Sequence, residues 1–413
     1  MRATRSSFVM CGLKVEIMDI RNLLSEDVYY TFAELQYSGV PGTKMSRREI
    51  KELMDKKDEL VGEGNLGFKD LGLKSFNSRY VFWNTHLELI ELFNEYRGLI
   101  ESEEVFGDDM DEMRRARIYS EVKGSINIEG YNSTRQLFDE LVRGREPVNK
   151  NEVVVRNMAH AIDYVQQGLP FNRDNFNALY RIISEDCLDE DQKLRDGEYY
   201  RYDDVFISTY TGAPVDKIAE CMDSLFEMVN HVIKTGDEML RFMLPHIVHY
   251  YIVYIHPFFD CNGRMARMCS LWISALVGTE GNPYFISEAI NDTKKEYYHA
   301  ISRTRDARND LTYFLKYIME TSISYALSYI KLNKYAEIVS IEGDALTLTE
   351  QLYLKKLIIK LDGRYFSWHD FVAAIGSDMS KQAALKYLNK WLSYGLLDSK
   401  LNTRKEKVFK IRD

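Results

Sequence analysis

A short polar segment between two apolar stretches carries side chains suited to binding an anion. Residues 256–267 read HPFFDCNGRMAR and combine an imidazole, a carboxylate, an amide and two guanidinium groups. Stability alone would favour a neutral turn between two buried helices, because unpaired buried charge is costly. Gly263 lets the backbone approach a ligand, and a helix that begins there directs free N–H groups and its positive dipole end toward a phosphate.

Four side chains of this segment have complementary chemistry. Arg264 and Arg267 lie three residues apart on the first helical turn, so both can face one ligand. Asp260 can hold Mg²⁺, which binds carboxylate and phosphate oxygens. His256 titrates near neutrality and can act as a general base. Together they predict an anion site with a proton acceptor beside it.

The histidines have two other interpretations besides a proton acceptor, namely a core residue and a zinc ligand. A single histidine is more often a core residue bonded to a carbonyl, but the polar groups around His256 favour catalysis. His246, His249 and His256 also cluster in the sequence, yet their spacing is not a zinc pattern and no acidic residue lies among them. We therefore interpret His246 and His249 as helix-packing and polar-face residues.

Residues 256–267 resemble the signature of the Fic domain, HxFx(D/E)(G/A)N(G/K)RxxR, and agree with it at every polar position. One position departs from it, because Cys261 stands where the family usually has Gly or Ala. The resemblance implies a protein adenylyltransferase, which moves AMP from ATP to a Ser, Thr or Tyr hydroxyl of a target protein. It also implies Mg²⁺ as cofactor and ATP as substrate.

The resemblance assigns a role to each matching position. His256 would deprotonate the acceptor hydroxyl, and Asp260 would place Mg²⁺ on the α- and β-phosphates. Arg267 would meet the γ-phosphate. The implied nucleotide-binding positions are Cys261, Asn262, Gly263, Arg264, Arg267 and Tyr298.

Two further segments resemble parts of the family. Residues 201–214, rich in aromatic and β-branched side chains, are similar to the Fic flap, a β-hairpin that aligns the target by strand pairing. Its edge would be Val205, Phe206 and Ile207, and the alternative is an ordinary surface hairpin. Tyr298 lies in a segment similar to the adenine-binding region, where it would stack on the base; helix packing is the alternative.

Residues 125–130, SINIEG, match the family's inhibitory pattern (S/T)xxxE(G/N). On a helix, Ser125 and Glu129 share a face. The resemblance implies that Glu129 pairs with Arg267 and takes the γ-phosphate position, so that ATP binds unproductively. In some Fic proteins the same glutamate assists removal of AMP from a target. The alternative is a solvated glutamate near a helix end.

The surrounding patterns predict a mainly α fold with few breaks. Proline is scarce, 7 in 413 residues, and apolar residues recur at helical spacing. We expect a Fic-type helical core with one hairpin in the middle of the chain. The predicted helices span 80–100, a segment ending near Gly130, 150–186, 214–234, and two buried stretches, 240–255 and 265–277.

The last part of the chain differs in charge from the rest. Residues 344–413 hold 13 Lys+Arg and 8 Asp+Glu and so carry a net charge of +5. Since the whole chain carries −9, the preceding residues carry −14. Predicted helices at 349–361, 367–375 and 380–394, with Ser367 and Ser380 as N-caps, precede two short strands. This order resembles a winged helix-turn-helix domain with its wing tip at 403–407. It can contact DNA through Lys381, Lys386, Lys390 and the wing, or serve a protein-binding or structural role, since +5 is modest for DNA.

Length and charge bound the remaining expectations. We divide the 413 residues into an N-terminal helical region at 1–105, a Fic domain at 106–335 and a winged-helix domain at 336–413. The net charge of −9 argues against a whole-molecule grip on nucleic acid or an anionic membrane. No apolar run is long enough for a membrane helix and the N-terminus is too weak for a signal peptide. The five scattered cysteines indicate reduced thiols and a cytoplasmic location; they are Cys11, Cys187, Cys221, Cys261 and Cys269.

The leading hypothesis is thus an adenylyltransferase autoinhibited by Glu129. A second hypothesis is a regulatory, nucleotide-sensing factor that binds DNA or protein and has weak or altered transferase activity. A third keeps the fold and changes the donor, since some relatives move phosphocholine, UMP or phosphate. A homodimer is an open expectation, because dimers occur in similar proteins.

Overall fold

The computed structural model describes residues 45–64, 67–100, 110–207, 210–278 and 286–412. Two apolar helices lie at its centre, α10 (Glu238–Ile255) and α11 (Asn262–Val277), and they pack on each other along their length. Nearly every side chain of both helices is buried, so they form the core that the apolar patterns predicted. The polar segment 256–261 connects them.

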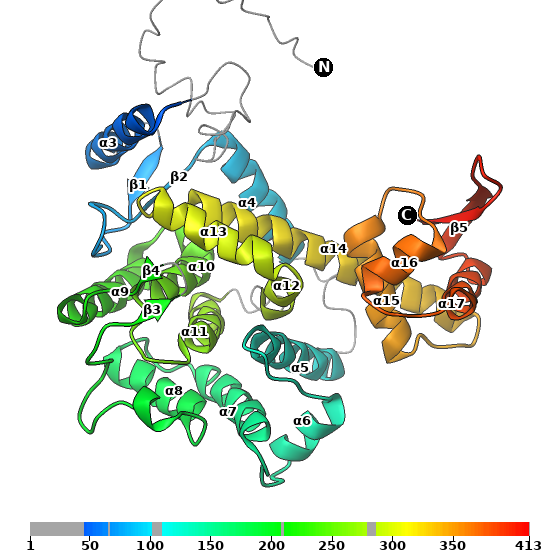
Figure 1. Ribbon diagram of the computed structural model, residues 1–413, viewed down its shortest axis with the longest axis horizontal. Coiled ribbons are helices and arrows are strands. Elements are labelled where there is room, and N and C mark those ends of the chain that lie inside the picture. The colour runs from blue at the N-terminus through cyan, green and yellow to red at the C-terminus, as the bar shows by residue number, and fades with distance from the viewer. Residues whose placement is uncertain (1–44, 65–66, 101–109, 208–209, 279–285, 413) are drawn as a thin grey trace, which may run out of the picture.

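The other helices surround this pair (Figure 1). α7 and α8 pack on one side of α11, α9 packs on α10, and α5 crosses near the beginning of α11. The surrounding helices are α4 (Leu87–Ile100), α5 (Met110–Ile128), α6 (Arg135–Val142), α7 (Lys150–Val165), α8 (Arg173–Ser184), α9 (Val215–Thr235), α12 (Ile286–Asp292), α13 (Lys294–Asp306) and α14 (Thr312–Ile341). A 3₁₀ turn, η2 (Glu190–Gln192), follows α8.

The N-terminal part contains a small hairpin that the sequence patterns did not predict. β1 (Phe68–Asp70) pairs antiparallel with β2 (Phe82–Asn84), after the helix α3 (Arg47–Glu63). The predicted helix 80–100 is therefore wrong at its start, since α4 begins only at Leu87. The main chain of Phe82 also bonds to Asn309 and Leu311, so a tertiary contact holds it in extended form.

The predicted helix 150–186 is likewise two helices. α7 ends at Val165 and α8 begins at Arg173, and the connection contains Gly168 with φ of 69° and Pro170. A left-handed glycine and a proline both stop a helix. By contrast, the predicted end near Gly130 is confirmed, because α5 ends at Ile128 and Gly130 has φ of 87°.

The long helix α14 leads from this body to the C-terminal elements (Figure 1). These are α15 (Leu348–Leu361), α16 (Trp368–Ile375), α17 (Lys381–Ser393), β5 (Leu397–Leu401) and β6 (Lys407–Ile411). β5 and β6 pair antiparallel, and Ser367 and Ser380 cap α16 and α17 as predicted. The assignment of this helix–helix–helix–hairpin order to a winged helix stays a prediction.

Buried apolar side chains form two large clusters. One runs from Leu71 to Ala326 and includes α10 and α11, and the other runs from Leu332 to Ile411. The predicted domain boundaries at 105 and 335 stay predictions. Among the helices in the described ranges, none has the length and apolar composition needed to cross a membrane.

Candidate functional site

The segment between α10 and α11 is held by its own side chains. His256 ends α10 in the left-handed region (φ 56°) and Cys261 precedes α11 in the same region (φ 69°). Phe258 is fully buried and stacks on Tyr180, with ring centroids 3.6 Å apart. The Asn262 side chain accepts from the Phe258 N–H at 3.0 Å and donates to its carbonyl at 2.8 Å. Asn262, predicted to bind nucleotide, thus uses its amide to fix the loop.

Arg267 is buried and bonds to the end of α5. Its Nε donates to the Ser125 hydroxyl at 2.8 Å, and its Nη2 donates to the Ser125 carbonyl at 3.0 Å and to Glu129 Oε1 at 2.7 Å. Only 1 % of the Arg267 side chain is exposed, against 33 % for Glu129. The structure therefore brings together Ser125, Glu129 and Arg267, as the inhibitory motif predicted.

The Glu129 carboxylate lies directly over the first turn of α11. A Cβ added at Gly263 would come within 2.6 Å of Glu129 Oε1, so only glycine leaves room for this approach. Burial works against the charged carboxylate, but Arg267, Arg264 and Lys294 outweigh it and lower the pKa of Glu129. The carboxylate thus lies at the N-terminal turn of α11, where the helix dipole favours an anion.

Three contacts fix α5 in place. A Cβ at Gly124 would meet the backbone of Ser287 and Glu288 at 2.5 Å, so glycine is required where α5 crosses α12. Nearby, the buried Glu121 carboxylate accepts from the Ser287 N–H at 3.0 Å and from the Ser287 hydroxyl. At the other end, Lys294 donates to the Ile128 carbonyl. These contacts determine where Glu129 lies.

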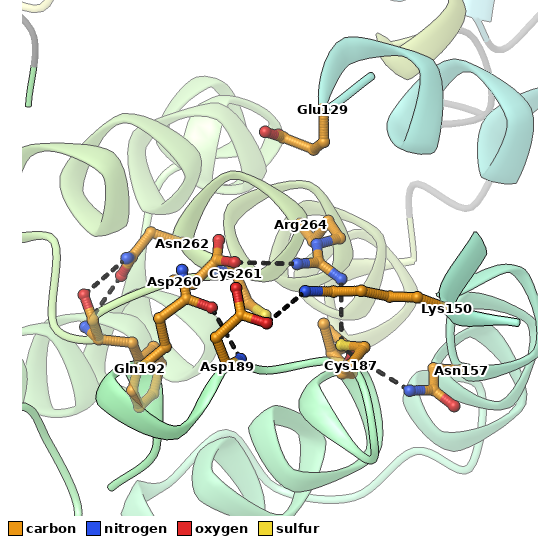
Figure 2. A network of polar contacts seen from close by, with 12 residues as sticks. Glu129, Lys150, Asn157, Cys187, Asp189, Gln192, Asp260, Cys261, Asn262 and Arg264 are labelled. Atoms are coloured by element: carbon orange, nitrogen blue, oxygen red, sulfur yellow. Dashed lines mark hydrogen bonds and ion pairs between the residues drawn. The ribbon is translucent and has the colours of Figure 1, made fainter. Parts of the chain in front are cut away.

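Arg264, also buried, faces a different set of groups (Figure 2). Its Nη2 lies 3.7 Å from Asp260 Oδ2, and its Nη1 lies 3.7 Å from Cys187 Sγ. The Tyr131 ring lies 5.8 Å from the guanidinium. Burial opposes the charge on Arg264, but Cys261, Cys187 and Asp260 outweigh it and raise the pKa of the guanidinium.

His256 is half-buried beside the hairpin. Burial lowers the pKa of His256 to about 4, and the Val253 backbone opposes this shift. Arg201, 2 % exposed, donates through Nε to the His256 carbonyl at 2.8 Å, through Nη1 to the Asp203 carbonyl at 2.7 Å and through Nη2 to the Ala213 carbonyl. Arg201 thus connects both sides of the hairpin base to the turn that carries His256.

The hairpin itself is short. β3 (Phe206–Ile207) pairs with β4 (Tyr210–Thr211), and Val205 lies just before β3. A Cβ on Gly212 would lie 3.2 Å from the His256 Cβ, so the hairpin base approaches the histidine closely. Phe206 is 86 % exposed, which leaves its ring and strand edge open to another chain. Its use as a target-docking flap stays a prediction.

Asp260 fits a single-carboxylate Mg²⁺ site. Its side chain is 40 % exposed, and Oδ1 accepts the Cys261 N–H at 2.5 Å while Oδ2 faces Arg264. Mg²⁺ commonly uses one or two carboxylates together with substrate phosphates. Within the described ranges, no group of three or more His, Cys, Asp or Glu side chains could hold a metal ion.

His246 and His249 lie in the core, whereas Tyr298 is partly exposed. His249 and His246 are fully buried, and their Nε2 atoms bond to the hydroxyls of Tyr297 at 2.8 Å and Tyr96 at 3.3 Å. Both pack inside the core, so the polar-face part of their interpretation is wrong. Tyr298 is 47 % exposed on α13, and burial and the nearby Glu129 raise its pKa. Tyr298 therefore lies near the site rather than in the core.

Sequence reasoning missed three residues that shape the site: Arg201, Cys187 and Lys294. Their partners lie 55, 77 and 166 residues away in the chain, at His256, Arg264 and Ile128. A local pattern gives no signal for contacts of this kind. Cys261 gave a weak signal, because a thiol stands there where the Fic signature usually has Gly or Ala.

Comparisons with known proteins find one family model and several similar solved structures. Residues 170–274 match the Fic/DOC family model, a range that includes the hairpin and segment 256–267 but neither Glu129 nor Tyr298. No curated protein sequence matches the chain. Similar solved structures include a Fic family protein from Desulfovibrio desulfuricans G20, with 18% identity and a TM-score of 0.46 over 79% of this chain and 95% of that chain. Fic-1 (residues 134–508) from C. elegans has 18% identity and a TM-score of 0.47 over 71% and 79%. IbpAFic2 covalently tethered to Cdc42 has 14% identity and a TM-score of 0.39 over 74% and 87%.

Proposed function

We propose that the chain transfers AMP from ATP to a Ser, Thr or Tyr hydroxyl of a target protein, and that Glu129 inhibits the transfer. The observation that carries the proposal is the 2.7 Å ion pair between Glu129 and Arg267 at the N-terminal turn of α11. The Fic/DOC match over residues 170–274 supports the nature of the reaction.

In this mechanism His256 is the proton acceptor. With a pKa of about 4 the imidazole is neutral at pH 7, and so it can take the proton of the acceptor hydroxyl. The acceptor oxygen then attacks the α-phosphorus and pyrophosphate leaves. Phe206 and Ile207 would present the target segment by strand pairing, beside His256.

The phosphates would be stabilised by the first turn of α11. Its free N–H groups and the buried Arg264 and Arg267 supply fixed positive charge where negative charge develops. Asp260 would hold Mg²⁺, and the ion would neutralise phosphate charge when bound. Tyr298, half-exposed beside Glu129, would stack on the adenine.

Glu129 inhibits because it competes with the γ-phosphate for Arg267. The guanidinium already has an anionic partner at hydrogen-bond distance, and α5 is anchored by Gly124, Glu121 and Lys294. ATP can bind its γ-phosphate productively only if the Glu129 carboxylate leaves. The site is thereby held closed to the productive pose of ATP.

The test compares five proteins, the wild type and four variants of the full chain, each incubated with Mg²⁺ and α-labelled ATP. We expect Glu129→Gly to increase label incorporation about tenfold or more, which corresponds to about 1.4 kcal/mol of removed competition. His256→Ala, alone or with Glu129→Gly, should incorporate none. Glu63→Gly is the matched control, because Glu63 also precedes a left-handed glycine at a helix end.

Three results would redirect the proposal. If Glu129→Gly is no more active than the wild type, inhibition by Glu129 is wrong. Label from γ-labelled but not α-labelled ATP would indicate phosphoryl transfer. Binding of ATP by every protein without any transfer would favour the regulatory, nucleotide-sensing alternative.

A second candidate function concerns the C-terminal elements. Lys381 and Lys386 on α17 and Arg404 and Lys405 in the β5–β6 turn are exposed, and Lys407 of β6 bonds to Asn389 on α17. Lys390 instead pairs with Glu350 at 2.9 Å. We propose contact with another macromolecule here, and a salt-dependent DNA shift by the full chain, lost in Lys386→Glu, would identify DNA as the partner.

A further inference from the structure

Two cysteines from distant parts of the chain meet at the first turn of α11. Cys187 follows α8 and Cys261 immediately precedes α11, and each is only 2 % exposed. Figure 2 shows both side chains beside Arg264. Each thiol alters the pKa of the other, and Cys187 Sγ donates to the Ile183 carbonyl at 3.4 Å.

The surroundings of this pair favour a thiolate. Arg264 Nη1 donates to Cys187 Sγ at 3.7 Å, so a buried cation faces the sulfur. The Cys261 thiol and Arg264 together outweigh burial and hold the pKa of Cys187 below its usual range. A nearby guanidinium lowers the pKa of a thiol, and the thiolate is the form of cysteine that reacts with oxidants.

The other described cysteines lack these features. Cys269 lies fully buried in α11, and burial raises its pKa well above the usual value. Cys221 on α9 is buried too, and burial likewise raises its pKa. Neither has an arginine contact among the hydrogen bonds of the described residues. The described part of the chain therefore contains one thiol pair beside a cation, and two further buried thiols that serve for comparison.

We propose that Cys187 and Cys261 form an oxidation site, at which a hydroperoxide converts the two thiols into one disulfide. The Cys187 thiolate attacks a peroxide oxygen, the O–O bond breaks, and a sulfenic acid and hydroxide form. The Cys261 sulfur then attacks the sulfenic sulfur, so that the S–S bond forms and the S–O bond breaks. For hydrogen peroxide, both oxygens leave as water with the two thiol protons.

The disulfide would link the segment after α8 to the residue before α11. Cys261 adopts a left-handed conformation and its N–H donates to Asp260, so the bond would fix the part of the loop that precedes Asn262. The proposal does not depend on AMP transfer, because it concerns only the thiols and Arg264. It also gives a chemical use to the position at which the loop departs from the family signature.

The test is mass spectrometry of the oxidised full-length protein. The protein is reduced, desalted, treated with hydrogen peroxide, unfolded in N-ethylmaleimide and digested. We expect a peptide pair joining Cys187 to Cys261, lighter than the two thiol peptides by two hydrogen atoms and removed by dithiothreitol. Cys269→Ser, the matched control in the same helix, should give the same pair, and Cys187→Ser should not.

The outcomes that overturn the proposal are equally distinct. It is wrong if Cys187 and Cys261 both remain alkylated by N-ethylmaleimide after oxidation, or if Cys187 stops at sulfinic acid while Cys261 stays free. It is also wrong if the linked peptides join Cys187 to another cysteine or to a second molecule, which non-reducing electrophoresis separates. A folded Cys187→Ser protein, checked by circular dichroism, excludes unfolding as the cause of a lost link.

Discussion

At the first turn of α11, buried charges from distant parts of the chain meet, whereas the helix starts of the C-terminal elements are capped by residues close in the sequence. Arg267 donates to Glu129, 138 residues earlier in the chain, and the His256 carbonyl accepts from Arg201, 55 residues earlier. In the C-terminal elements, Ser367 and Asp370 cap each other at the start of α16, only three residues apart. The first turn of α11 is thus held by residues far apart in the sequence, whereas these helix starts are held by residues a few positions apart.

This difference predicts how far the destabilising effect of a substitution should extend through the fold. A buried guanidinium that bonds to several segments holds them together, and its removal leaves several carbonyls unpaired. A helix cap satisfies N–H groups of its own first turn, so its loss weakens one helix end. Substitutions around α11 should therefore have larger effects than those at caps of the C-terminal helices.

The largest effect is expected for Arg201→Met. The variant leaves the carbonyls of His256, Asp203 and Ala213 without their donor inside the protein. We expect a loss of about 2–4 kcal/mol in the free energy of unfolding, since each unsatisfied buried group costs about 1–3 kcal/mol and some relax. Urea denaturation followed by circular dichroism measures the loss.

Arg201→Lys is the matched variant for this experiment. It keeps the charge but has fewer donors in a less rigid arrangement, so it should restore only part of the stability. Equal stability of Arg201→Met and wild type would mean that the hairpin base does not depend on this residue. Buried contacts around α11 would then not be more important for stability than the helix caps of the C-terminal elements.

A second effect concerns the pH dependence set by Glu121. Burial raises the pKa of Glu121 from 4.5 to about 8, although the Ser287 hydrogen bonds and Arg267 oppose the shift. The folded protein therefore binds a proton that the unfolded chain releases, so this stabilisation is complete below about pH 4.5 and is lost as the pH rises through about 8. Glu121→Gln keeps an acceptor for Ser287 and removes the titration.

We expect the melting temperature of the wild type to fall more steeply from pH 5 to pH 8 than that of Glu121→Gln, by several degrees. Differential scanning calorimetry at each pH measures the difference. Glu91→Gln, at an exposed position on α4, is the matched control and should follow the wild type. Parallel profiles for Glu121→Gln and wild type would show that Glu121 does not titrate in this range.

The close crossing of α5 and α12 predicts a smaller loss for Gly124→Ala. Its Cβ would meet backbone atoms at 2.5 Å, which cannot rotate away as a side chain can. We expect a loss of about 1–3 kcal/mol from overpacking. Gly98→Ala on α4 is the matched control, because its Cβ meets nothing within 4 Å and alanine should gain up to about 1 kcal/mol there.

The Gly124 variant also connects the fold to the proposed inhibition. If α5 shifts to relieve the contact, Glu129 moves with it and the ion pair to Arg267 weakens. Label incorporation from α-labelled ATP should then increase in Gly124→Ala but not in Gly98→Ala. A destabilised Gly124→Ala without any change in labelling would separate the position of α5 from inhibition.

The features that could be predicted from the sequence are those set by local contacts, and those that could not are set by distant contacts. The end of α5 near Gly130 and the caps Ser367 and Ser380 were predicted, because each is a signal within four residues of the element that it ends or begins. The pairing of Glu129 with Arg267 was predicted only through the family resemblance. The positions of Arg201 and Cys187 could not be predicted, because their partners are set by tertiary packing.

The hairpin β1–β2 shows why the remaining errors occurred. Phe82 has apolar neighbours at helical spacing, yet its strand pairs with β1, and its own N–H and carbonyl bond to Asn309 and Leu311. A strand of three residues gives almost no alternation to detect. Here the tertiary contact outweighed the local pattern.

The smallest effects are expected at the caps, where Ser367→Ala and Ser380→Ala can be compared directly. Ser367 accepts from the Asp370 N–H at 3.3 Å, while Asp370 in return accepts the Ser367 N–H at 2.7 Å. Ser380 accepts from the Ala383 N–H at 3.3 Å without a reciprocal bond. Thermal unfolding should show a loss of about 1 kcal/mol for Ser367→Ala and a smaller loss for Ser380→Ala. Because each cap acts only on its own helix, neither variant should change labelling by the Glu129→Gly protein. A change in labelling would show that the C-terminal elements act on the site over distance, and the separation between the two regions would have to be abandoned.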